Sequence, residues 1–186
     1  MKKRCAWPND PLMIAYHDKE WGVPVHDDKK IFEFIVLDTF QAGLSWSTIL
    51  KKRENFRKAF DGFNVNKIAK YDSKKLTQLL KDEGIIRNRL KVHATVQNAV
   101  AFKKIQKEFG SFDLYIWQFV KGKPILNKWK RIGSVPSNSK ESDKMSIDLK
   151  KRGFKFVGTT ICYAFMQASG MVNDHTTDCF RYEQVV

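Results

Sequence analysis

The sequence predicts an all-α fold for this chain of 186 residues. Apolar residues recur at every third or fourth position through most of the chain, which is the spacing of one helix face. Gly, Pro, Asn, Ser and Asp separate these runs, at positions where helices commonly start and stop. No run alternates between apolar and polar residues as a half-buried strand does, so no sheet is expected.

The chain is expected to begin with an irregular segment followed by a long apolar helix. Residues 1–27 lack a period because four breaking residues interrupt them: Pro8, Pro11, Gly22 and Pro24. Asp27 or Asp28 can cap a helix over 28–42. Gln41-Ala42-Gly43 ends that helix, because Gly is the residue that most often follows a helix C-terminus.

Three further helices are expected to start at polar caps in the next stretch of the chain. Ser45 can cap a helix that runs to Phe60. Asn64 and Ser73 can cap two shorter helices, of which the second stops at Gly84.

The remaining helices are separated by one long aperiodic stretch. A long helix is expected from Arg87, and residues 112–120 form another helical face. Residues 121–141 contain two Pro, two Gly and many Lys, Ser and Asn, so we expect a surface loop. Two last helices are expected around 143–152 and 157–169. The whole chain 1–186 is therefore interpreted as one domain.

The charge balance points to an anionic partner. Lys and Arg total 34 against 20 Asp and Glu, which gives a formal net charge of +14. Nucleic acid would relieve this self-repulsion best, an anionic membrane surface comes second, and a basic cytosolic protein without such a partner is the alternative. The start MKKRCAWPND lacks the apolar run of a secretory signal, and no stretch reaches the ~20 apolar residues of a membrane span. A cytoplasmic protein with reduced thiols is expected.

Four residues from the two ends of the chain could form a metal site. His175 and Cys179 are four residues apart, which places both on the same side of a helical turn. Cys5 and His17 form a second, looser pair, and two Cys with two His suit a tetrahedral structural zinc. The spacing of Cys5 and His17 matches no zinc-finger pattern, so buried thiols and polar histidines remain an equal alternative. Cys162 lies in an apolar helix and is interpreted as a core residue.

Several motifs of the chain resemble the DNA-3-methyladenine glycosylase I family. They are residues 15–22 (AYHDKEWG), 41–46 (QAGLSW), 50–54 (LKKRE), 153–158 (GFKFVG) and 173–175 (NDH), together with Cys5 and Trp7. The resemblance covers nearly the whole chain and is weakest at 121–141 and after Cys179.

The resemblance implies a helix-hairpin-helix glycosylase fold whose terminal segments are joined at a structural zinc. It implies a central lobe over roughly 45–120 and a zinc-tied lobe made of 1–44 and 140–186. By matching positions, one Zn²⁺ ion would be held by four side chains: Cys5, His17, His175 and Cys179. Because all four ligands are protein groups, this zinc would have no open position for a catalytic water.

The resemblance also implies a hydrolase that flips a methylated adenine out of double-stranded DNA and releases it without cutting the strand. By matching positions, Tyr16 and Trp46 would sandwich or edge the base, while Trp7 and Trp21 would shape the pocket wall. Met13 stands where many relatives have a second pocket Tyr. Asp38 stands where the family carries a Glu that contacts the base, so its carboxylate is one methylene shorter.

Two loops would contact the DNA if the resemblance holds. Leu44, after Gly43, resembles the wedge that fills the gap left by the flipped base, and a buried turn leucine is the alternative. Gly84, Ile85 and Arg87 match the hairpin, where backbone N–H groups can bind a phosphate. Four nearby residues add positive charge: Lys81, Arg87, Arg89 and Lys91. Such an enzyme can act as a monomer.

Three hypotheses follow for the activity. The leading one is a glycosylase that releases 3-methyladenine from alkylated DNA without a lyase step. A second is the same fold with another preference among alkylated purines, suggested by the departures at Met13, Asp38, Thr39 and Phe40. A third is a non-catalytic zinc module that binds damaged DNA. Base release from methylated DNA separates the three.

Overall fold

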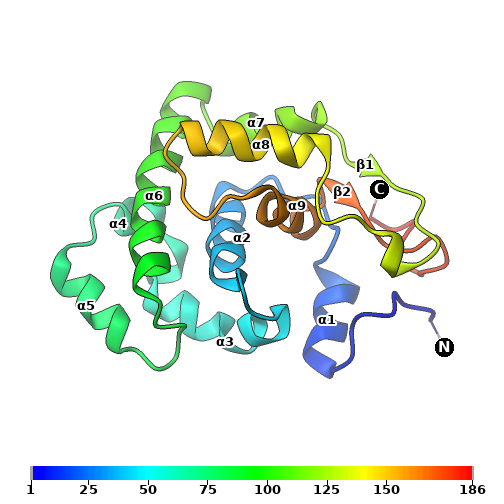
Figure 1. Cartoon of the computed structure of the whole chain (residues 1–186), viewed down its shortest axis with the longest axis horizontal. Coiled ribbons are helices and arrows are strands. Elements are labelled where there is room, and N and C mark those ends of the chain that lie inside the picture. Colours follow the sequence, from blue (N-terminus) through cyan, green and yellow to red (C-terminus); the bar gives the residue numbers. More distant parts are fainter. Residues whose placement is uncertain (1, 186) are drawn as a thin grey trace.

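The computed structural model describes residues 2–185 and confirms an all-α fold (Figure 1). The described residues contain nine α-helices and two very short strands. The helices are α1 Pro11–Lys19, α2 Asp28–Gln41, α3 Trp46–Ala59, α4 Val65–Ile68, α5 Ser73–Lys81, α6 Arg89–Phe109, α7 Phe112–Trp117, α8 Lys140–Lys151 and α9 Thr159–Ala168. Within this part of the chain, no helix combines the length and the apolar character needed to cross a membrane.

Helix α2 lies at the centre of the fold. Every residue from Ile31 to Phe40 is buried, so the helix has no solvent-facing side over most of its length. It packs against α3, α6, α7 and α9 (Figure 1). The side chain of Asp27 accepts a hydrogen bond from Lys30 N (2.8 Å) and starts the helix, as the sequence predicts. A carboxyl group on this helix is therefore surrounded by protein.

The expectation of an irregular segment over residues 1–27 is wrong, because α1 lies within it. Asp10 is the N-cap, and its carboxylate accepts a hydrogen bond from Met13 N (2.8 Å). Pro11 occupies the first helical position, where its missing N–H costs nothing and its fixed φ favours the helix. A proline that the sequence analysis treats as a helix breaker is thus the residue at which the helix begins.

The helices of the middle of the chain begin at the predicted caps, with small shifts. Ser45 and Asn64 cap α3 and α4. Asp72, and not Ser73, caps α5, which ends at Lys81, before the predicted end at Gly84. Helix α6 starts two residues later than predicted, at Arg89, because the side chain of Asn88 caps it. The residues between α5 and α6 form a tight turn, called here the 82–88 turn.

The predicted loop over 121–141 crosses toward the chain termini. It contains strand β1 (Ile125–Leu126), which pairs in parallel with strand β2 (Val172–Asn173). No sheet was expected, and a pair of two-residue strands gives no detectable alternation in the sequence. Phe180 N donates to Lys3 O (2.9 Å), so both ends of the chain lie on the same side of the molecule (Figure 1).

The segment after α9 packs closely on the segment after α1. Gly170 has a φ of +70°, and a Cβ atom there would lie 2.3 Å from the backbone of Val23 and Pro24. Only glycine allows this approach. Gly22 N also donates to Gln167 O (3.0 Å). Residues from both ends of the chain thereby reach one place, and the candidate metal ligands lie there.

Candidate active site and metal centre

Cys5, His17, His175 and Cys179 come together in a buried group, called here the Cys/His cluster. Their ligand atoms all lie within 4.8 Å of one another. Sγ of Cys179 is 3.5 Å from Nε2 of His17 and 3.6 Å from Nδ1 of His175, and Sγ of Cys5 is 3.6 Å from the same Nδ1. In a tetrahedral zinc site, ordinary Zn–S and Zn–N bonds place sulfur and nitrogen about 3.6 Å apart. The four side chains therefore fit a metal ion of this size.

Neighbouring groups orient the two histidines of the Cys/His cluster as a metal requires. Nδ1 of His17 bonds to the Asp18 carboxylate (2.8 Å), which leaves Nε2 for the metal. Nε2 of His175 lies 3.0 Å from Trp21 O, which leaves Nδ1. Such outer partners fix the tautomer and the ring orientation of ligating histidines. Burial lowers the pKa of both histidines, that of His175 to about 4, so both rings are neutral.

A row of aromatic rings connects the Cys/His cluster to helix α3. Ring centroids are 4.6 Å apart for Trp21 and His175, and 5.1 Å apart for Trp7 and Trp21. Trp7 lies 6.4 Å from Tyr16, and Tyr16 lies 5.3 Å from Trp46. All of these pairs are tilted or edge-on, as aromatic rings prefer. The Cys/His cluster therefore supports the tryptophans that were predicted to form a pocket wall.

An ion-pair network fixes the three helices that carry the predicted site residues. Arg53 of α3 binds Glu20, just after α1, with two bonds of 2.9 Å, and Glu33 of α2 with one of 2.6 Å. Arg53 is buried, so this network is shielded from water. Arg53 and Glu20 lie in the family motifs, yet their pairing is not readable from sequence because they are far apart along the chain.

Asp38 of α2 is a buried carboxyl without a hydrogen-bond partner for its Oδ2 atom. Burial raises the pKa of Asp38 well above its ordinary value, and no positive group offsets this effect. Burial raises the pKa of Tyr16 well above its ordinary value, and the negative charge of Asp38 adds to that rise. A small apolar cavity of about 10 Å³ adjoins Asp38 and is lined by Ile35, Ile116, Leu149, Val157, Ile161, Cys162 and Phe165. It has room for about one water and not for a purine.

Three other side-chain polar atoms, on α2, on α3 and in the segment before α1, are also buried without partners. They are Nε1 of Trp46, Nε1 of Trp7 and Oγ1 of Thr39. Buried polar groups in proteins are nearly always paired, so a group of unpaired ones favours a ligand site. Asp38, Tyr16 and Trp46 come from α2, α1 and α3 respectively, which the Arg53 network holds together. These atoms offer a ligand an acid group, N–H donors and ring faces.

The rings of Tyr16 and Trp46 contact each other in this structure. Their centroid separation of 5.3 Å is shorter than the ~7 Å that a ring stacked between them would need, which is two van der Waals contacts. In this structure the two rings therefore leave no space for a base stacked between them. Met13 lies one turn before Tyr16 on the same face of α1 and is buried, as a pocket residue would be.

The loop that joins α2 to α3 presents its apolar residue to solvent. Leu44 is 42% exposed, so the alternative of a buried turn leucine does not apply. Gly43 has a φ of +78°, and nothing lies within 4 Å of the position its Cβ would take. This loop, called here the 42–45 loop, therefore projects from the surface next to the C-terminal end of α2 (Figure 1).

The 82–88 turn has a buried side chain that faces the core and a charged side chain that faces solvent. Ile85 is buried, so its side chain anchors the turn and does not face a ligand. A Cβ at Gly84 would lie 2.9 Å from Oδ1 of Asp82 and 3.1 Å from Cβ of Asn55 of α3, so a larger residue would crowd the turn. The Arg87 side chain is exposed and lies 3.5 Å from Glu83. Lys91, predicted to add surface charge here, is instead buried.

The chain is similar over most of its length to proteins of one family. The family model described as methyladenine glycosylase matches residues 6–182. DNA-3-methyladenine glycosylase 1 of Escherichia coli (strain K12) is 49% identical over 181 residues, covering 97% of each protein. A crystal structure of 3-methyladenine DNA glycosylase I has a TM-score of 0.93 at 50% identity, covering 96% of this chain and 98% of that chain. A Tyr-to-Phe variant of 3-methyladenine DNA glycosylase I, in complex with 3-methyladenine, has a TM-score of 0.92 at 34% identity, covering 95% of this chain and 96% of that chain.

Proposed function

The chain belongs to the methyladenine glycosylase family, and on this premise we propose that it releases 3-methyladenine from alkylated DNA. The reaction is base-excision repair: the damaged base is flipped out and its glycosidic bond is hydrolysed, with no strand cleavage. The observation that carries the proposal is Asp38, a buried acid with an unpaired oxygen, on the helix α2 that packs against α3 of Trp46.

Charge explains how this site can select a methylated adenine. Methylation at N3 makes the base cationic while it is still attached to the sugar. Burial keeps the Asp38 carboxyl neutral, and a cation beside it favours the ionised form. Binding of the cationic base and ionisation of the carboxyl therefore promote each other. An unmodified adenine is neutral and leaves the carboxyl protonated. Ring faces of Tyr16 and Trp46 add cation–π attraction for an electron-poor ring.

The chemical step needs little help from a proton donor. A cationic base departs as a neutral molecule, so its protonation is unnecessary. Asp38, Tyr16 and Trp46 act by binding and orienting the base. As the glycosidic bond breaks, its electron pair leaves with the base, and a water adds to the positively charged sugar and releases one proton to the solvent.

We propose that the metal of the Cys/His cluster is one structural Zn²⁺. Two thiolates and two imidazoles are a preferred donor set for zinc, and the sulfur–nitrogen distances of 3.5–3.6 Å agree with tetrahedral bonds. When bound, such an ion supplies folding free energy and stays outside the reaction. One zinc per chain by elemental analysis is expected.

We further propose that the 82–88 turn with α5 and α6 is a helix-hairpin-helix that binds a phosphate of double-stranded DNA. Exposed Arg87 and the start of α6 supply the positive charge. Leu44 on the 42–45 loop would enter the base stack as the wedge. The division into a lobe of 45–120 and a lobe of 1–44 with 140–186, and a cytoplasmic monomer as the working form, are parts of the same proposal.

One assay tests the proposed activity against its alternatives. Methylated duplex DNA is incubated with the protein, and the released bases are separated and identified. Release of 3-methyladenine is expected. Release of another alkylated purine in its place would favour the altered-specificity hypothesis, and DNA binding with no base released would favour the non-catalytic module. Asp38→Glu, run in parallel, measures how the shorter acid affects rate and selectivity.

A further inference from the structure

Two lysines donate to backbone carbonyl groups of loops far from them in sequence. Lys91 lies in the first turn of α6 and is 5% exposed. Its Nζ donates to Phe40 O (2.8 Å) and to Ala42 O (2.5 Å), at the C-terminal end of α2. These are among the carbonyls that an α-helix leaves without partners at its end. A lysine cation there also interacts favourably with the helix dipole.

The carbonyls that Lys91 binds lie at the start of the 42–45 loop. Ala42 is the residue directly before Gly43, whose φ of +78° turns the chain outward toward Leu44. Leu44 N donates to Gln41 O (2.6 Å), so the turn is short and tight. Because Lys91 binds the carbonyls at the base of this turn, it sets the direction in which Leu44 projects.

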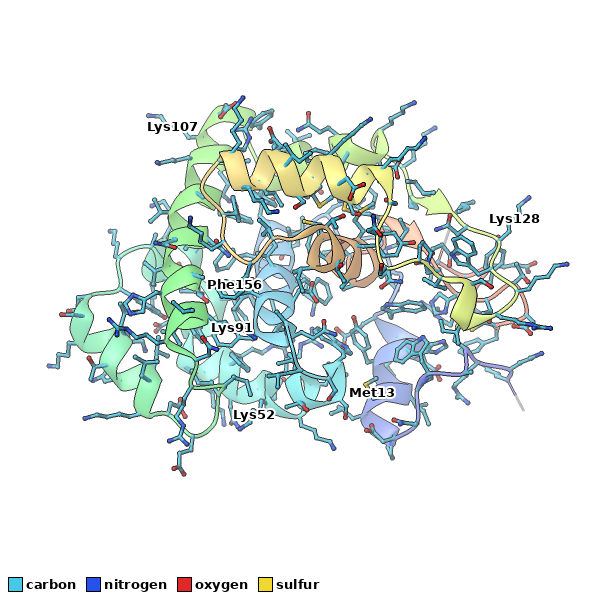
Figure 2. The ribbon with its side chains drawn as sticks, viewed as in Figure 1. Met13, Lys52, Lys91, Lys107, Lys128 and Phe156 are labelled. Atoms are coloured by element: carbon cyan, nitrogen blue, oxygen red, sulfur yellow. The ribbon has the colours of Figure 1, made fainter. Side chains whose placement is uncertain are left out.

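Lys52 makes the reciprocal arrangement. It lies on α3, directly after the 42–45 loop, and its Nζ donates to Glu83 O (2.9 Å) and Gly84 O (3.3 Å) of the 82–88 turn. Lys91, on the helix that follows the 82–88 turn, therefore binds the 42–45 loop. Lys52, on the helix that follows the 42–45 loop, binds the 82–88 turn. Figure 2 shows Lys91 in the first turn of α6 and Lys52 on α3.

The ammonium group of Lys91 binds acceptors within the protein. The side chain is buried, and the acceptors of its ammonium group are the two carbonyls. Burial lowers its pKa, which indicates that no carboxylate offsets the desolvation. The exposed cations Arg87 and Arg89 lie nearer to solvent on the same surface and are better placed for phosphate.

We propose that Lys91 and Lys52 are positioning residues that lock the 42–45 loop to the 82–88 turn, so that seating the turn on DNA directs Leu44 into the base stack. The inference rests on the proposed function, because it assigns the two loops their roles as wedge and phosphate clamp. Lys91 touches neither base nor DNA in this proposal. It acts through the carbonyls of Phe40 and Ala42.

The test compares Lys91→Met with Lys107→Met, which removes the same charge from the opposite end of α6 (Figure 2). Single-turnover release of 3-methyladenine is measured on methylated duplex and on methylated single-stranded DNA. We expect the Lys91→Met rate on duplex to fall about ten- to a hundredfold, as for a misplaced catalytic element. Its rate on single-stranded DNA, where no base has to leave a stack, should change less than about twofold. Lys107→Met should match wild type on both.

A second variant and a second signal keep the test decisive. Lys52→Met, at a partly exposed site, should show the same loss confined to duplex, and it carries the test if Lys91→Met does not fold. An equal loss on both substrates would overturn the proposal. So would a fall of about 0.9 in the slope of log affinity against log salt for Lys91→Met, the signature of a lost phosphate contact.

The inference can also be checked without base release. A duplex with a stable abasic analogue beside 2-aminopurine reports unstacking by its fluorescence. Wild type and Lys107→Met should raise the fluorescence, and Lys91→Met should not. If wild type raises it but releases no 3-methyladenine, the proposed activity fails while the positioning role stands. If Lys91→Met raises it as wild type does, the positioning role fails.

Discussion

At the scale of single residues, the buried carboxyl of Asp38 affects both the proposed binding of a cationic base and the free energy of unfolding. Its raised pKa means that the folded protein binds a proton that the unfolded chain has released, over the pH range between the two pKa values. The free energy of unfolding therefore falls as pH rises through this range. The same buried group is the one that gains most from a cationic ligand, because an opposite charge removes the desolvation penalty.

Asp38→Asn tests both sides of this relation. We expect base release to fall by about 100-fold or more, because the variant cannot supply a negative charge to the base. We expect the stability of the variant relative to wild type to increase between pH 5 and pH 8, because only wild type has a carboxyl to ionise. Single-turnover assays and urea unfolding at both pH values measure these effects. A stability difference independent of pH would contradict the assignment.

Residues of the site differ in how well sequence reveals them. Asp38 can be singled out because an acid in an apolar helix is unusual. The Cys/His ligands can be paired only through the family resemblance, since Cys5 and His175 are 170 positions apart. Lys91 and Arg53 could not be identified, because a basic residue in an amphipathic helix normally faces water. Only the tertiary fold brings carbonyls or carboxylates to them.

At the scale of helices, α1 depends on one cap. Asp10 binds Met13 N and also accepts a hydrogen bond from Ser47 of α3 (3.2 Å), so it joins the start of α1 to the helix of Trp46. Tyr16 and His17 lie further along α1. A loosened α1 would therefore affect the pocket and the Cys/His cluster together.

Asp10→Ala is expected to lower Tm by about 2–4 °C, the usual effect of a lost N-cap in a domain of this size. It should also reduce base release, because α1 carries Tyr16. Asp72→Ala is the matched control, since Asp72 caps α5 through Lys75 N (2.8 Å). It should lower Tm similarly and leave release of the base unchanged on single-stranded DNA. Thermal melts measure the change in Tm, and single-turnover assays measure base release.

The helices themselves are largely predictable, and the exceptions have physical causes. The long helices α2, α3, α6 and α9 follow from apolar spacing and from caps such as Ser45. Helix α1 was missed because proline has opposite effects at the first position and in the interior of a helix. The strand pair β1–β2 was missed because it depends on partners 47 residues apart, as in the pairing of Ile125 with Val172.

At the scale of the whole molecule, the Cys/His cluster closes the chain on itself. Removal of the metal with a chelator should lower Tm by more than about 10 °C, since metal binding in such a site is folding free energy. Cys179→Ser should reproduce the loss, while Cys162→Ser, a buried thiol outside the cluster, should not change metal content. Elemental analysis and melting curves measure this. A metal-free protein that melts as the untreated one would rule out a structural metal.

The net charge of +14 should strengthen the proposed binding to DNA. Affinity for duplex should fall steeply with salt. Arg87→Ala should reduce the slope of log affinity against log salt by about 0.9, because it removes one phosphate contact. Lys128→Ala removes an exposed charge far from the 82–88 turn (Figure 2) and should leave the slope unchanged. Equal slopes for both variants would place the DNA elsewhere.

Joining segments so distant also sets an order of events during synthesis. Cys179 follows His17 by 162 positions, which a ribosome covers in roughly 10 to 30 seconds. Over that interval Cys5 and His17 are already made but have only each other as ligands. Trp7 and Trp21 likewise have no His175 to pack against. We expect the nascent chain to build its α2–α6 core first, and the row of aromatic rings to become ordered only after His175 and Cys179 have emerged.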